Sequence, residues 1–383
     1  MIDYRLTEEQ LALQEMAREF AQKEMRPNAA KYDQSHEFPY EIMEKAFSAG
    51  FMTAGIPEAY GGGGLGNLDL AMISEELSAG CPGMFTSIMA VSLATTPIVQ
   101  YGSDEQKKKF LAPLCQKMGL GAYCLTERES GSDAGSIKTK ALKSGNEYVL
   151  NGAKCFITNG GVASLYVVFA KTAPEKGARG MSVFAVPKGT PGITVGKTED
   201  KMGHRASNTA ELFFEDVRVP AENLIGKERQ GFVIAMKTFD HTRSSVGAAA
   251  VGIARAALEY AVEYAKTRCQ FGKPIALHQM TQAKIADMAT DIQAARHLVW
   301  HAAWLSDQGK PCGKESAMAK CFATDVAMRV TTEAIQIFGG YGYMKDYPVE
   351  KLMRDAKLLQ IYEGTNEIQR LVIAHDVIGP VKS

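Results

Sequence analysis

The stretch EYVLNGAKCFITN, residues 147–159, marks where the pattern of this sequence changes from helical to β. Two β-like runs flank Asn151-Gly152, a dipeptide typical of a two-residue hairpin turn. CFITNGG is expected to close the next hairpin, and further apolar runs follow in SLYVVFAKT, MSVFAVPKG and TAELFFEDVRVP, separated by turns that contain glycine or proline. Residues 120 to about 225 are therefore predicted to form an all-β unit, either a small barrel or a sandwich.

The segments on both sides of this unit have helical periodicity. Near the N-terminus, Thr7 and Gln10 have the spacing of a capping box, and Pro27 is expected to end the helix that follows. After the β unit, VGAAAVGIARAALEYAVEYAKTR is rich in alanine and glycine, and three periodic stretches lie at about 276–308, 314–338 and 366–378.

This order predicts an α+β protein with three domains. They are an N-terminal α-helical domain at 1–119, a middle β-barrel or sandwich domain at 120–228, and a C-terminal four-helix-bundle domain at 229–383.

Composition narrows the possible functions. The 383 residues are 46% apolar and 22% charged, and the 43 basic and 43 acidic side chains cancel, so bulk charge favours neither a nucleic-acid nor a membrane partner. The seven cysteines are scattered without a C-x-x-C pair, which indicates reduced thiols and no metal site. No apolar run reaches the length of a membrane span, and the N-terminus lacks a targeting pattern, so we expect a bacterial cytoplasmic protein or a mature organelle-matrix chain.

Two segments of the β unit carry candidate binding residues. AYCLTERESGSD, residues 122–133, ends a strand in a turn with Thr126, Gly131 and Ser132, whose hydroxyls and N–H groups could hold a phosphate or a polar ring edge; a plain hairpin turn is the alternative. In CFITNGG, Phe156 and Thr158 would lie on the same side of a strand and suit a flat heterocycle, although Phe156 taken alone would be a core residue.

Three helical segments raise similar questions. FDHTRSS is expected to open a helix with Asp240 and Arg243 on one face, where a surface ion pair is the alternative. Gly339-Gly340 could simply end a helix. IYEGTNEIQR places Glu363 ahead of a helix-like run, where a solvated loop acid is the ordinary interpretation.

Taken in order, YCLTE, GSD, FITNGG, FEDVRVP, TRCQFGKP, QIFGGYGY, YPVEKLMRDAK and IYEGTNEIQR resemble the acyl-CoA dehydrogenase family over essentially the whole chain. The resemblance is greatest to short- and medium-chain, butyryl-CoA-type members. It implies FAD as cofactor, an acyl-CoA substrate, a homotetramer built as a dimer of dimers, and an electron-transfer flavoprotein as electron acceptor.

The resemblance also implies residue roles. Glu363 would be the catalytic base that removes the α-proton, with hydride passing from Cβ to flavin N5 to give a trans-2-enoyl-CoA. FAD contacts are implied at Tyr123, Leu125, Thr126, Gly131, Ser132, Phe156, Thr158, Thr365 and Glu367 and, across a dimer interface, at Arg268, Phe271, Gln279, Gln336, Gly339 and Gly340. Substrate contacts are implied at Met89, Ser132, Phe239, Asp240, Arg243, Tyr362 and Gly364.

Some positions depart from the family pattern. Arg128 and Glu129 stand where a proline and a small residue are usual, and Phe156 stands where many members have tryptophan. Thr242 occupies the place of the base in branched- and long-chain members, which supports Glu363 as the base here. Met89 could shorten the acyl pocket, so we expect short or short-to-medium acyl groups, with a cyclic acyl group as an alternative.

Other functions remain to be weighed. An enoyl-CoA reductase would use the same site in the opposite direction. An acyl-CoA oxidase would typically carry a further C-terminal helical domain, which does not follow here, and a non-catalytic binding scaffold could dispense with the retained Glu363.

Overall fold

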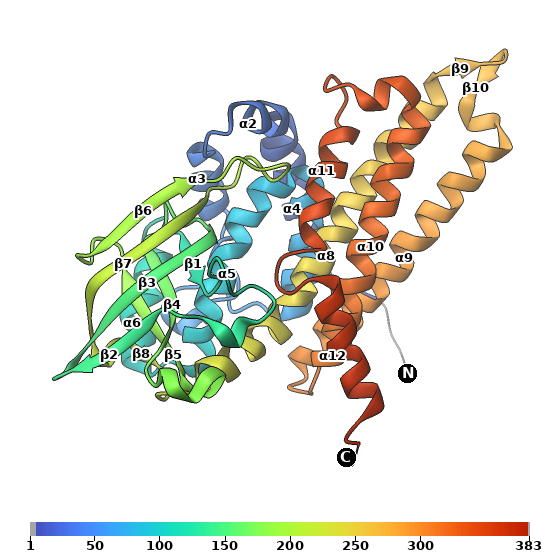
Figure 1. Cartoon of the computed structure of the whole chain (residues 1–383). Helices are drawn as coiled ribbons and strands as arrows, with labels where there is room; N and C mark the ends of the chain where they lie inside the picture. The colour runs from blue at the N-terminus through green and yellow to red at the C-terminus, as the bar shows by residue number, and fades with distance from the viewer. Residues whose placement is uncertain (1–4, 382–383) are drawn as a thin grey trace.

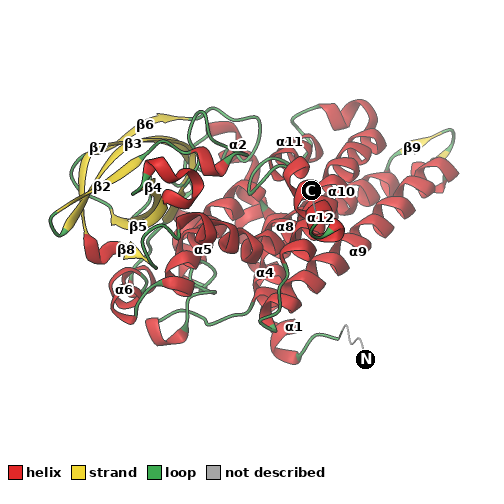
Figure 2. Ribbon diagram, turned by 60° about the horizontal axis from the view of Figure 1, so that its bottom comes forward, coloured by secondary structure: helices red, strands yellow, loops and turns green. Residues whose placement is uncertain are grey.

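The computed structural model describes residues 5–381, and this part of the chain is helical, then β, then helical (Figure 1). The sheet lies at one side of the molecule and the long C-terminal helices at the other, with α4 and α5 between them (Figure 2). The predicted three-part α+β fold is thereby confirmed. The predicted boundaries at 119/120 and 228/229 remain a proposal; they fall in the connections from α7 to β1 and from β8 to α8.

The N-terminal part consists of seven helices: α1 (Glu8–Phe20), α2 (Ala29–Ser35), α3 (Tyr40–Ser48), α4 (Asn67–Gly80), α5 (Pro82–Tyr101), α6 (Asp104–Phe110) and α7 (Ala112–Gln116). The predicted capping box is confirmed, because the Gln10 N–H donates to Thr7 Oγ1 at 3.2 Å and the Thr7 N–H donates to Gln10 Oε1 at 3.1 Å. The expectation that Pro27 ends the helical run was wrong. Pro27 lies in a short 3₁₀ helix, Arg26–Asn28, that directly follows a π-helical turn at Ala21–Met25; this irregular stretch accommodates the proline, and the run continues into α2.

The β part has eight strands in one sheet: β1 (Gly121–Cys124), β2 (Lys140–Ser144), β3 (Glu147–Thr158), β4 (Leu165–Lys171), β5 (Met181–Pro187), β6 (Ile193–Thr198), β7 (Thr209–Pro220) and β8 (Leu224–Ile225). The hydrogen-bonded order is β6-β7-β3-β2-β4-β5-β8, and β1 pairs in parallel with β4. The predicted β domain is confirmed.

The predicted hairpin at Asn151-Gly152 was wrong. Both residues lie inside the single strand β3, at a bulge in its pairing with β7. The turn between β2 and β3 is instead at residues 145–146, where Gly145 has φ 62°. A Cβ on Gly152 would lie 2.4 Å from Thr139 Oγ1, so this glycine permits a close approach of two chain segments and not a turn.

CFITNGG also does not close a hairpin, because β4 pairs with β1, β2 and β5 and not with β3. The buried Asn159 side chain donates to the carbonyls of Ser87 at 2.9 Å and Gly121 at 3.1 Å. These bonds tie the end of β3 to α5 and β1, so that the chain crosses the sheet instead of folding back.

The C-terminal part contains α8 (Gly231–Thr267), α9 (Gln279–Asp307), α10 (Gly313–Phe338), α11 (Val349–Leu359) and α12 (Asn366–Ile378), with a small hairpin of β9 (Cys269–Gln270) and β10 (Lys273–Pro274) between α8 and α9. The expectation that FDHTRSS opens a helix was wrong. α8 begins at Gly231, and no breaking residue separates that start from the segment.

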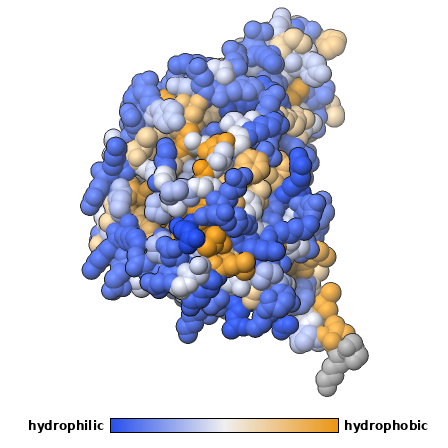
Figure 3. All heavy atoms as spheres, turned by 60° about the vertical axis from the view of Figure 1, so that its left-hand side comes forward, coloured by the Kyte–Doolittle hydropathy of each residue, from blue (hydrophilic) through white to orange (hydrophobic). Residues whose placement is uncertain are grey.

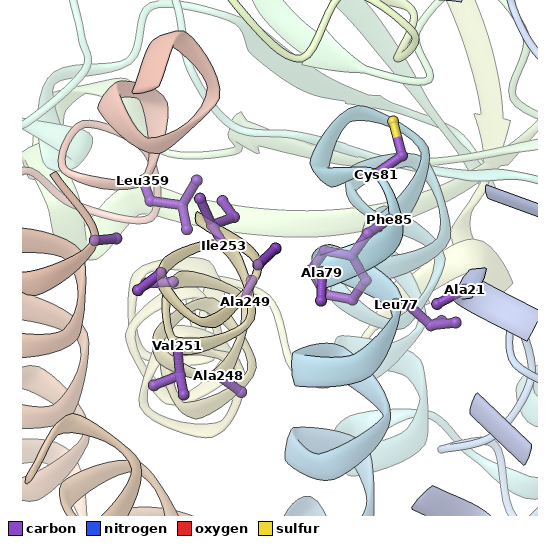
Figure 4. Close-up of a cluster of buried hydrophobic side chains, with 14 of the residues drawn as sticks. Ala21, Leu77, Ala79, Cys81, Phe85, Ala248, Ala249, Val251, Ile253 and Leu359 are labelled. Carbon is purple, nitrogen blue, oxygen red and sulfur yellow. The ribbon is translucent and has the colours of Figure 1, made fainter. Parts of the chain in front are cut away.

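Small residues let α8 occupy the centre of the molecule. A Cβ on Gly252 would lie 2.1 Å from the carbonyl oxygen of Glu75, so α8 and α4 approach more closely than side chains would allow. Figure 4 shows part of the resulting core, in which side chains of α8 join those of α4, α5 and the end of α11.

Two described helices, α5 and α8, are long and apolar enough to cross a membrane by length and composition. In both, most of the apolar window is inside the fold, 83% and 72% respectively, which is what core helices of a folded protein show.

Candidate active site

Glu363 lies in the loop between α11 and α12, and its side chain is buried, with the residue only 8% exposed. Thr242 of α8 donates its hydroxyl hydrogen to Glu363 Oε2 at 2.6 Å, whereas the buried Oε1 has no partner among the described residues. Burial raises the pKa of Glu363, and the Thr242 hydrogen bond and the charges of Arg243 and Lys320 oppose this rise. The alternative of a solvated loop acid is therefore wrong, and one carboxylate oxygen is left free to accept a proton.

The backbone at this position is left-handed at two consecutive residues. Glu363 has φ 52° and Gly364 has φ 92°. For a glutamate this conformation costs on the order of 1 kcal/mol, so surrounding contacts must hold it. At 364 the φ of 92° favours glycine, and a Cβ there would also lie 2.6 Å from Gln369 Nε2, so the Gln369 side chain would have to move.

Arg243 of α8 lies behind this loop and is buried, with only 4% of the residue exposed. Its Nη1 lies 3.4 Å from Asp240 Oδ1, and its guanidinium lies over the Phe239 ring at 5.7 Å. Burial lowers the pKa of Arg243, but the group stays a cation beside Glu363. The alternative of a surface ion pair is wrong for this residue.

The other side of Glu363 is formed by uncharged side chains. The Tyr362 hydroxyl is buried beside Thr86, and its ring lies 6.3 Å from that of His204. His204 Nδ1 is 2.7 Å from Thr86 Oγ1 of α5, and burial lowers the pKa of His204 to about 4, so the imidazole is neutral. Met89 of α5 is buried in the same core cluster. This wall suits a hydrocarbon chain.

Tyr123 of β1 lies near enough to Glu363 for the charge of the carboxylate to act on its hydroxyl. Its ring packs against Phe169 and Phe239, with centroids 4.7 and 5.6 Å away. Its buried hydroxyl lies beside Thr238; burial raises the pKa of Tyr123, and the charge of Glu363 raises it further. Glu363 Oε1 is thus a buried oxygen without a partner among the described residues, near the buried hydroxyls of Tyr123 and Tyr362.

The turn after β1 is shaped by two reciprocal backbone bonds between Glu127 and Ser130, at 3.1 and 3.0 Å. Arg128 and Glu129 are exposed at its tip, and Glu129 pairs with Lys138. The two residues that depart from the family pattern therefore point to solvent, while Thr126, Gly131 and Ser132 lie at the base and the following bend with partly or fully exposed surfaces.

The sequence interpretation missed the anchor of this turn. Lys154 of β3 is fully buried and donates to Glu127 Oε1 at 2.8 Å and to the Leu125 carbonyl at 3.0 Å. Burial raises the pKa of Glu127, but the charge of Lys154 and the N–H donors around the carboxylate outweigh it and hold the pKa below its usual value. A lysine next to Cys155 and Ile157 in the second half of this strand is the signal that could have revealed this pair.

Phe156 is not a core residue. It is 64% exposed and has φ 56°, and it lies at a second irregularity in the pairing of β3 with β7. Thr158, two residues on, is half-buried. An exposed aromatic ring held by a strained backbone is a suitable platform for stacking a flat heterocycle. Figure 3 shows that the face bearing the sheet is otherwise largely hydrophilic with scattered apolar areas.

The remaining implied FAD residues lie at the far end of the helical bundle from the sheet (Figure 1). A groove of about 440 Å³ there is lined by Arg268, Tyr341, Gly339 and Gly340, among others. Gly339 does end α10, at φ 61°. Phe271 is 93% exposed at the tip of the β9–β10 hairpin, and Gln279 and Gln336 are exposed. One chain therefore does not bring this group to Thr126 and Phe156.

At the start of α12, the Thr365 side chain accepts from the Ile368 N–H and caps the helix, and Glu367 is exposed in its first turn. Lys320 of α10 and Gln369 of α12, which the sequence interpretation did not single out, contact the backbone beside Glu363. Within residues 5–381 no group of His, Cys, Asp and Glu side chains is arranged to hold a metal ion.

Three family models match the chain in order. They describe the N-terminal, middle and C-terminal domains of acyl-CoA dehydrogenases and match residues 7–118, 122–217 and 229–378.

The chain is also similar to individual proteins over nearly its full length. It is 50% identical to an acyl-CoA dehydrogenase of Bacillus subtilis, covering 98% of this chain and 99% of that protein. It is equally 50% identical to the acryloyl-CoA reductase (NADH) of Anaerotignum propionicum, covering 98% and 96%. The solved structure of butyryl-CoA dehydrogenase from Megasphaera elsdenii superposes with a TM-score of 0.96 at 47% identity, covering 99% of this chain and 100% of that chain.

Proposed function

This chain belongs to the acyl-CoA dehydrogenase family of FAD enzymes, and we propose that it dehydrogenates a short acyl-CoA between Cα and Cβ with Glu363 as the base. The observation that carries this assignment is the carboxylate of Glu363, which is buried with one oxygen bonded to Thr242 and the other unpaired. A general base needs an accessible lone pair and a raised pKa, and both are present.

The residues around Glu363 have different roles in proton removal. Thr242 fixes Oε2, so Oε1 faces the α-proton of the thioester. The charge of Arg243, next to Glu363, favours the carboxylate and opposes the rise in pKa that burial causes. We propose that Tyr362 and Met89, which lie against the same helical core, line the acyl side. Bound FAD supplies the two-electron acceptor for the Cβ hydride, so the thioester loses a proton and a hydride and becomes a trans-2-enoyl-CoA.

The residues present fit FAD. The buried hydroxyl of Tyr123, the exposed ring of Phe156 and the open turn at Thr126 and Ser132 offer polar and stacking contacts in one domain. We propose that Leu125, Gly131, Thr158, Thr365 and Glu367 complete this side. We further propose that Ser132, Phe239, Asp240 and Gly364 contact the CoA thioester.

The separation of Arg268, Phe271, Gln279, Gln336, Gly339 and Gly340 from the sheet supports a cofactor shared between two subunits (Figure 1). We propose that this group reaches the FAD of a neighbouring copy, that the protein is a homotetramer, and that an electron-transfer flavoprotein accepts its electrons. The free cysteines and the bacterial relatives support a cytoplasmic location.

The acyl group should be short. Phe85 and Met89 of α5, the segment proposed to form the floor of the acyl site, are 3% and 7% exposed, and the bulk of these two side chains supports a short acyl group. The test is anaerobic reduction of the bound flavin by a series of straight-chain and cyclic acyl-CoAs. Fast reduction by butyryl-CoA that declines with chain length supports the proposal, and no reduction by any thioester would overturn it.

Glu363→Gln is the companion test of the base. It keeps the size of the side chain and removes the proton acceptor, so flavin reduction should slow by roughly 10²- to 10⁴-fold while FAD content and acyl-CoA binding stay near the parent values. Reduction at the parent rate would show that another group takes the proton.

A second candidate function is supported by the acryloyl-CoA reductase, which is as similar to this chain as the dehydrogenase is. The same residues would then return a proton to Cα. If acyl-CoAs leave the flavin oxidised, while enoyl-CoA rapidly oxidises the chemically reduced protein, the reductase direction holds.

A further inference from the structure

The two backbone carbonyls that follow the base are bound by three buried side chains from three different helices. The Glu363 carbonyl accepts from Arg243 Nε of α8 and from Gln369 Nε2 of α12, both at 3.3 Å. The Gly364 carbonyl accepts from Gln369 Nε2 at 2.9 Å and from Lys320 Nζ of α10 at 2.8 Å. Arg243, Lys320 and Gln369 thus form what we call the carbonyl clamp.

Lys320 is held firmly in this role. It is fully buried, and its ammonium also donates to Asn366 Oδ1 at 2.9 Å. Asn366 is bonded in turn to Thr324 and Asp325 of α10, so the first residue of α12 is fixed to the same helix as Lys320. Burial lowers the pKa of Lys320 to about 8, and the group keeps its charge through neutral pH.

The clamp acts where the chain most needs support. Glu363 and Gly364 both have left-handed φ, a conformation that an isolated glutamate would leave. Relaxing φ at Glu363 would rotate its side chain and both carbonyls together, since they share the same short segment. Buried carbonyls without donors are costly, so the clamp and the left-handed backbone stabilise each other.

We propose that Lys320 and Gln369 are positioning residues for the base: by binding the carbonyls of Glu363 and Gly364 they keep the left-handed loop and aim the carboxylate at the substrate. This inference rests on the proposed role of Glu363. Neither side chain is placed to touch the reacting carbon atoms; each acts through the backbone.

Lys320 also contributes charge. The titratable groups facing Glu363 are Arg243 of α8, Lys320 of α10, and the hydroxyls of Tyr123 on β1 and Tyr362 on the loop. Those facing Lys320 are Glu363, Arg243, Cys321 and Asp325. The ammonium stabilises the Glu363 carboxylate, so its removal raises the pKa of Glu363 and the base becomes protonated at higher pH.

The test compares Lys320→Met, Gln369→Met and the control Lys314→Met. Lys314 lies on the same helix but pairs with Asp376 at 3.1 Å, away from the loop. In each FAD-loaded variant, the limiting rate of anaerobic flavin reduction at saturating acyl-CoA is measured across pH, together with FAD content and acyl-CoA affinity.

We expect Lys320→Met and Gln369→Met to lower the limiting rate by about 10²-fold, the scale of a misplacement of about 1 Å, with affinity and FAD content unchanged. The acid limb of the pH profile should move to higher pH in Lys320→Met and stay in place in Gln369→Met, because only the former loses a charge. Lys314→Met should behave as the parent.

Parent-like limiting rates in both clamp variants would overturn the proposal, as would a rate loss matched by an equal loss of FAD. If Lys320→Met does not fold, the limiting rate of the Gln369→Met variant, which loses no charge, tests the positioning role. Glu363→Gln distinguishes the proposed base from the proposed positioning residues. If Glu363→Gln reduces the flavin at the parent rate, the role of Glu363 as the base is refuted. If Glu363→Gln is inactive while the clamp variants behave as the parent, only the positioning role is refuted.

Discussion

Thr242→Val is the most direct probe of how the fold sets the strength of the base. Valine matches threonine in shape but has no hydroxyl, and the position is buried, so no water readily replaces the lost donor. The hydrogen bond from Thr242 to Glu363 Oε2 is 2.6 Å long and favours the carboxylate. A hydrogen bond to a charged group contributes about 1.5–3 kcal/mol, and about 1.4 kcal/mol corresponds to one pKa unit. The pKa of Glu363 should therefore rise by about 1–2 units.

The sign of the effect follows from the protonation state. Glu363 must be a carboxylate to accept the proton, so a raised pKa removes the active form at higher pH, and flavin reduction by Thr242→Val should fall off earlier as pH decreases. At alkaline pH the base is ionised in both proteins, and the rates should converge. Stopped-flow anaerobic reduction across pH measures this shift.

Thr331→Val is the matched control, because Thr331 is buried in α10 and its hydroxyl bonds only to carbonyls of its own helix. An unmoved acid limb in Thr242→Val, with a Thr331→Val profile like the parent, would refute the reasoning. So would a shift to lower pH.

Two further predictions concern the cofactor regions. Lys154→Met removes the charge partner of the buried Glu127 carboxylate, so the free energy of unfolding should fall by about 3–5 kcal/mol in chemical denaturation. Lys138→Met removes the exposed partner of Glu129 and should change the free energy of unfolding by less than about 1 kcal/mol. Equal losses in the two variants would contradict the buried-pair argument. Arg268→Gln should weaken FAD retention and tetramer assembly together, because a ligand shared between subunits links the two equilibria. If sedimentation shows a fully tetrameric protein that has lost its FAD, the proposal of a shared site is contradicted.

Local sequence patterns predicted much of the fold. The capping box at Thr7, the long periodic stretches and the run of β segments each depend on neighbours within a few residues, and the helical, β, helical order followed from them directly. The choice of Glu363 also came from the sequence, through its place among motifs that resemble the family.

Tertiary structure decided what local pattern could not. Asn151-Gly152 has the composition of a turn, yet pairing with β7 on one side and β2 on the other made it the interior of a strand, because a sheet position satisfies more backbone groups than an isolated hairpin. Pro27 predicts the end of a helix, yet the helical run continues through it into α2.

The chemistry of the site depended on the fold in the same way. The burial of Glu363, its single donor from Thr242 and the clamp formed by Arg243, Lys320 and Gln369 bring together three helices that are far apart in the chain. A pKa is set by every charge and dipole within a few ångströms, whatever their distance in sequence, so the sequence could name the base while only the folded chain could make it one.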